Sequence, residues 1–123
     1  MDVKDLAFAA LYHDDLGVRQ WVKSALRCKF DFSQVRLPQL LDSELCVAAC
    51  LVELLAQRCN QDAPAWVHTV GPSDHPIYLM PSAKSIDRWR DGTPECLEKR
   101  NVFACPDYLN FTLQGADEGR ARP

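Results

Sequence analysis

The sequence lacks the features that mark several broad classes of protein. It has 14 Lys and Arg residues against 17 Asp and Glu, so it has no basic excess of the kind that nucleic-acid binders use to neutralise phosphates. No apolar run approaches the roughly 18 residues that a membrane-spanning helix needs. The N-terminal stretch MDVKDLAFAALYHDD has no basic segment followed by a long apolar one, as a secretion signal would. We therefore expect a cytoplasmic protein with no nucleic-acid or membrane partner.

Paired metal-ligand spacings such as Cys-x-x-Cys and His-x-x-x-His are also missing, although the chain has six cysteines. Cys46 and Cys50 fall in the most apolar segment, where thiols usually fill a core. Without a secretion signal we expect reduced thiols rather than disulfides. We expect no metal and no other cofactor. A metal shared by Cys46, Cys50 and a distant histidine is the weaker alternative.

The most informative segment is residues 45–55 (LCVAACLVELL), in which ten of eleven residues are apolar and the exception is Glu53. A helix that is apolar on nearly every side belongs in the centre of a fold. We predict this helix over about residues 43–58, with Asp42 or Ser43 as its N-terminal cap. A carboxylate in such a helix needs a partner or a route to solvent, so Glu53 indicates a buried polar site.

Helical spacing of apolar residues also predicts helices over residues 2–12 and 15–26, capped by Asp2 and by Asp14 or Asp15. Short helices are expected over residues 82–90 and from Thr93 to Arg100. Residues 77–80 (IYLM) and 101–105 (NVFAC) can pair as a small two-stranded ribbon. The prediction is a mainly α fold, with one compact helical domain over residues 1–113 and a polar tail over residues 114–123.

Glu53 has two candidate partners in the second half of the chain, Arg100 and Arg88. An ion pair with either would be structural, since buried charges are normally paired. In the alternative interpretation these residues line a pocket for an anionic small molecule, as a binding domain or an enzyme. The candidate ligand-binding residues are then Glu53, Trp66, His68, Arg88 and Arg100. No catalytic residues are assigned, because no histidine has an evident nucleophile beside it.

Phe8 and Tyr12 lie four residues apart and off the main apolar face of the first predicted helix. Residues at this spacing stack along one side of a helix. They are candidates for a homodimer interface through the N-terminal helices, because large exposed apolar patches are uncommon on monomers. Alternatively, both rings cover the connection that contains Phe30 and Phe32.

Three stretches of the second half form a recognisable pattern: PAWVH, then PIYLMP, then RWRDGTPECLEKRNVFA. Over about residues 40–111, and more loosely over residues 15–26, the chain resembles a family of small uncharacterised helical proteins of bacteria. The chain departs from the family pattern where Ser-Pro becomes Thr93-Pro94 and a phenylalanine becomes Leu97. The family-like positions are Trp66, Arg100, Asn101, Val102 and Phe103.

The resemblance assigns no activity and no catalytic residues. It implies a module that sits beside helix-turn-helix regulators or near toxin–antitoxin and mobile-element genes. Together with the absence of a catalytic constellation, it favours a non-catalytic accessory protein that binds a protein partner or a second copy of itself. The small-molecule site around Glu53 remains the alternative.

Overall fold

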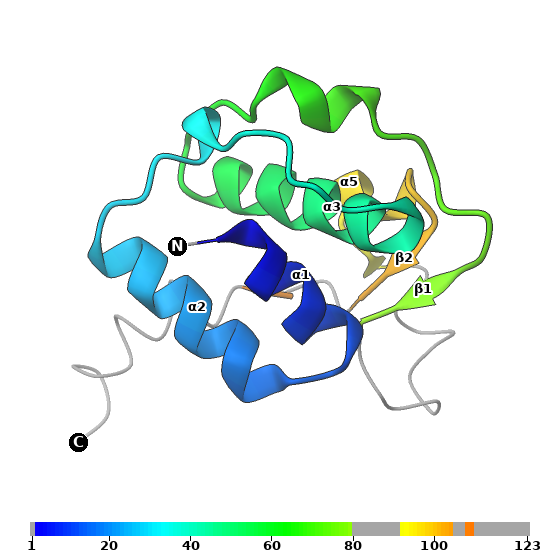
Figure 1. Cartoon of the computed structure of the whole chain (residues 1–123), viewed down its shortest axis with the longest axis horizontal. Coiled ribbons are helices and arrows are strands. Elements are labelled where there is room, and N and C mark those ends of the chain that lie inside the picture. Colours follow the sequence, from blue (N-terminus) through cyan, green and yellow to red (C-terminus); the bar gives the residue numbers. More distant parts are fainter. Residues whose placement is uncertain (1, 80–91, 105–107, 110–123) are drawn as a thin grey trace.

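A computed structural model of the chain describes residues 2–79, 92–104 and 108–109, and this part of the chain is mainly helical, as the sequence predicts. α1 (Val3–Leu11) and α2 (Asp15–Arg27) form a helical hairpin at one side of the molecule (Figure 1). The predicted caps are confirmed: the Asp2 carboxylate accepts the Lys4 N–H, and the Asp14 carboxylate accepts the Gly17 N–H.

α3 (Asp42–Arg58) is the centre of the fold, as predicted. It packs against α1 and against three short helices: η1 (Phe32–Gln34), η2 (Ala65–Thr69) and α5 (Glu95–Glu98). Every residue from Cys46 to Ala56 is buried, Glu53 included. A helix surrounded in this way has no wet face, which explains why its sequence shows so little polar periodicity.

The predicted cap of α3 is wrong. Leu41 occupies the N-cap position and forms no side-chain capping bond. Asp42 lies in the first turn with a positive φ of 50°, so its carboxylate comes one residue too late to cap the helix.

The predicted ribbon is confirmed in its pairing. β1 (Ile77–Tyr78) and β2 (Val102–Phe103) run parallel, with Ile77 opposite Val102 and Tyr78 opposite Phe103. β2 follows α5 after a turn of three residues, and α5 itself packs against α3 (Figure 1).

Residues 35–41 connect η1 to α3 without helix or strand, and we call this segment the strap. It runs along α3 (Figure 1), and the residues at its two ends, Val35 and Leu41, have extended φ and ψ angles. Trp66 holds it at one end by donating its indole N–H to the Val35 carbonyl over 2.8 Å. Leu40 is buried near the other end, whereas Leu37 and Leu41 are exposed.

Some predictions concern residues outside the described ranges: the helix over residues 82–90, Arg88, Cys105 and the tail over residues 114–123. Among the helices that the structure does describe, none has the length and apolar character needed to cross a membrane.

Candidate functional site

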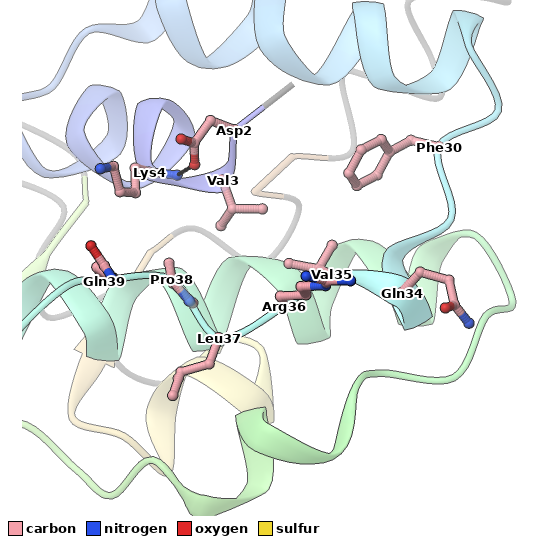
Figure 2. A pocket seen from close by; sticks show the side chains of 10 residues that line it. All are labelled: Asp2, Val3, Lys4, Phe30, Gln34, Val35, Arg36, Leu37, Pro38 and Gln39. Carbon is pink, nitrogen blue, oxygen red and sulfur yellow. Dashed lines mark hydrogen bonds between the residues drawn. The ribbon is translucent and has the colours of Figure 1, made fainter.

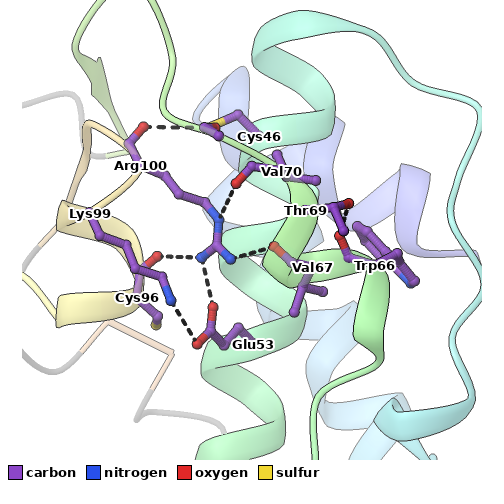
Figure 3. A network of polar contacts seen from close by, with 10 residues as sticks. Cys46, Glu53, Trp66, Val67, Thr69, Val70, Cys96, Lys99 and Arg100 are labelled. Carbon is purple, nitrogen blue, oxygen red and sulfur yellow. Dashed lines mark hydrogen bonds and ion pairs between the residues drawn. The ribbon is translucent and has the colours of Figure 1, made fainter.

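Of the two candidate partners of Glu53, the structure places Arg100 beside it. The Arg100 Nη1 atom lies 2.7 Å from the Glu53 Oε1 atom, and both residues are buried, with 2% and 6% of their surface exposed (Figure 3). Lys99 lies 3.2 Å from the other carboxylate oxygen, but its side chain is 44% exposed. The sequence indicated this pairing because a carboxylate inside an apolar helix needs a cation.

Arg100 also donates to three backbone carbonyls. Nη1 donates to the oxygen of Cys96, the second residue of α5, over 2.7 Å. In η2 and just after it, the Val67 oxygen accepts from Nη2 over 2.6 Å and the Val70 oxygen accepts from Nε over 3.3 Å. A guanidinium has five N–H groups, and four of those of Arg100 donate to Glu53 and to these three carbonyls.

The two cations of this cluster stabilise the charged form of Glu53. Burial by itself would raise the pKa of Glu53, but hydrogen bonds from Arg100 and Lys99 hold it below its ordinary value of 4.5. In the described part of the chain, no buried side-chain nitrogen or oxygen lacks a hydrogen-bond partner. The cluster therefore offers few free groups to an anionic ligand.

The other candidate ligand-binding residues do not join this cluster. Trp66 is half-buried and uses its indole N–H on the strap, and His68 is exposed on η2. Arg88 lies outside the described residues. Of the four candidates that the structure describes, Glu53 and Arg100 lie together. They form an internal ion pair rather than the wall of an open pocket.

Sequence reasoning missed the thiols that border the cluster. The Cys46 thiol donates to the Arg100 carbonyl, with 3.4 Å between sulfur and oxygen. A hydrogen bond with the Cys50 thiol lowers the pKa of Cys46, whereas burial raises that of Cys50 well above its ordinary value and that of Cys96 to about 11. The four-residue spacing of Cys46 and Cys50 was the available signal, since it places both on one helix face.

Two hollows flank the strap, and sequence analysis indicated neither. One, of about 600 Å³, lies between the strap and the start of α1 (Figure 2). The other, of about 640 Å³, lies between the strap, the start of α3 and residues 69–75, and Cys46 and His75 are among its lining residues. Leu37 borders both hollows. Within residues 2–79, 92–104 and 108–109, no group of three or more His, Cys, Asp or Glu side chains could hold a metal ion.

Phe8 and Tyr12, the predicted interface residues, stack with their ring centroids 6.3 Å apart. Phe8 is half-buried against the core, while Tyr12 is 73% exposed at the end of α1. Leu16, at the start of α2, is 63% exposed. We call Phe8, Tyr12 and Leu16 the corner patch.

No family model matches the sequence, and the comparisons with curated proteins and with solved structures found no significant match.

Proposed function

We propose that the protein is a non-catalytic interaction protein that forms a homodimer through the corner patch. A place beside a toxin or a mobile-element regulator, as the sequence resemblance implies, is one setting for such a role. The observation that carries the proposal is the exposure of Tyr12 and Leu16, two large apolar side chains at the junction of α1 and α2. Exposed apolar groups gathered in one place are typical of interaction surfaces.

The charged residues near the corner patch favour a second copy of this chain as its binding partner. Asp14 caps α2 and Asp15 is its first residue, whereas Arg19 and Lys23 are exposed further along the same helix. A two-fold axis that pairs α2 helices in opposite directions brings the acidic start of one beside the basic middle of the other. Such complementarity steers association and selects its orientation.

A non-catalytic role is also supported by the buried charges. A ligand-binding or catalytic role for Glu53 and Arg100 would require free acceptor and donor groups facing a cavity. Glu53 accepts from two cations, and Arg100 donates to Glu53 and to three carbonyls. These bonds account for the two residues as internal connections of the fold.

Sedimentation equilibrium at micromolar concentration tests the proposal. The wild type is expected to be a dimer, and Tyr12→Glu with Leu16→Glu a folded monomer, because both side chains are exposed and their replacement leaves the core intact. The matched control is Gln57→Glu with His68→Glu, which adds the same charge at exposed positions elsewhere. A monomeric wild type, or a dimer that survives the corner substitutions, overturns the proposal.

A further inference from the structure

The backbone of the strap has unused hydrogen-bonding groups. The N–H groups of Arg36, Leu37 and Gln39 have no acceptor among the residues that the structure describes. The carbonyls of the same three residues accept no hydrogen bond there either. Exposed backbone of this kind can pair with an extended chain, in the way that an open sheet edge does.

The hollow between the strap and α1 has an apolar wall beside this free backbone. Its apolar lining comes from Val3, Phe30 and Val35 (Figure 2). The Phe30 ring is held in place by edge contacts with Trp21 and Phe32, at centroid distances of 5.8 and 5.0 Å. The volume of about 600 Å³ falls in the range of roughly 300 to 1,000 Å³ that is usual for binding pockets.

The charged groups of the hollow are mainly positive. The Lys4 and Arg36 side chains have no ion-pair partner within the described part of the chain. The third charged residue of the lining is Asp2, whose carboxylate already accepts the Lys4 backbone N–H. With Lys4 and Arg36 positive and Asp2 negative, the lining carries a net charge of +1, whereas the formal net charge of the chain is −3.

We propose that this hollow binds an extended acidic peptide segment of another protein. The peptide backbone pairs with the free N–H and C=O groups of Arg36, since neighbouring residues of an extended segment direct these groups to opposite sides. An aliphatic side chain of the peptide packs on Phe30 and Val35, and its carboxylates bind Lys4 and Arg36. This binding site is separate from the corner patch and extends the role beyond self-association.

A labelled peptide of alternating glutamate and valine, with blocked ends, is the probe, and fluorescence anisotropy at low salt is the measurement. The same peptide with lysine in place of glutamate tests the charge requirement. A version methylated at alternate backbone nitrogens tests the backbone pairing. Each peptide is measured on the wild type and on the Tyr12→Glu, Leu16→Glu protein, so that self-association does not affect the result.

Saturable binding of the acidic peptide is expected, weakened at least about fivefold by Arg36→Glu. Arg27→Glu, which makes the same change at an exposed position of α2, is expected to alter binding by less than about twofold. Loss of binding by the methylated peptide is also expected. The proposal is overturned by absence of binding, by equal binding of the lysine peptide, by equal effects of the two arginine substitutions, or by full binding of the methylated peptide.

Discussion

At the scale of single residues, Glu53 is a buried carboxylate whose counter-charge, Arg100, is buried as well. Glu53→Ala leaves Arg100 buried without its counter-charge, so we expect the free energy of unfolding to fall by about 3 kcal/mol. Lys99→Ala is the matched control, because the Lys99 side chain is 44% exposed and its pair with Glu53 is expected to contribute less than about 1 kcal/mol. Urea denaturation measures both. Equal losses for the two variants would show that the buried pair with Arg100 contributes no more than the exposed pair with Lys99.

The lowered pKa of Glu53 also predicts how stability depends on pH. A carboxylate whose pKa is lower in the folded chain stabilises it above the unfolded value and loses this effect as pH falls through the folded value. The stability difference between wild type and Glu53→Ala should therefore be constant near neutral pH and shrink below about pH 4.5. Denaturation curves from about pH 7 to 3 measure this difference. A difference that grows on acidification would contradict the assignment.

The thiols should differ in reactivity according to their burial. Cys28 is exposed, whereas burial raises the pKa of Cys50 and of Cys96. Among the five cysteines that the structure describes, iodoacetamide at mildly alkaline pH should modify Cys28 first and Cys50 and Cys96 last in the native protein. In denaturant, all six cysteines should react without prior reduction. Peptide mapping by mass spectrometry follows each site, and an intact disulfide would contradict the second expectation.

At the scale of elements, α1, α2 and α3 end in the same way. Each is followed by a residue with positive φ that is not glycine: His13, Lys29 and Asn60, at 59°, 54° and 56°. The residue that follows each of them donates its N–H to the carbonyl five residues earlier. The Phe30 N–H, for example, donates to the Ala25 oxygen. This is the helix ending that glycine fits best, because glycine has no Cβ.

Lys29→Gly is therefore expected to raise the free energy of unfolding by about 1 kcal/mol. Lys23→Gly, the same change at an exposed position in the interior of α2, should lower it by a similar amount, because glycine disfavours a helical interior. Thermal melts of both variants measure the two changes. If Lys29→Gly is the less stable of the two, the positive φ at Lys29 is not a source of strain.

The elements that the sequence predicts best are those specified by local pattern. Apolar spacing and a capping aspartate located α1 and α2, and the continuous apolar run located α3. The pairing of Glu53 with Arg100 was also predictable, since a buried carboxylate needs a cation. The strap and its hollows could not be predicted in this way, because residues 35–41 have no periodic pattern that fixes the path of the chain. Such a path is set by distant contacts such as that of Trp66 with Val35.

At the scale of the whole molecule, the charge cluster connects segments that are far apart in the sequence. Glu53 belongs to α3, Arg100 follows α5, and the Val67 and Val70 carbonyls lie in η2 and just after it. A cation bound to all of these holds η2 and α5 against the central helix (Figure 3). The central claim is that this cluster stabilises the fold and takes no part in binding.

The most direct test combines Glu53→Leu and Arg100→Met in one chain. Glu53→Leu leaves the buried Arg100 without its counter-charge, so we expect a loss on the order of 3 kcal/mol in the free energy of unfolding. Arg100→Met leaves the buried Glu53 with Lys99 as its cation, and we expect a loss of the same sign. The double variant should lose clearly less than the sum, because its core contains neither charge, and it should dimerise as the wild type does. Additive losses, or a folded double variant that no longer self-associates, would contradict a purely structural cluster.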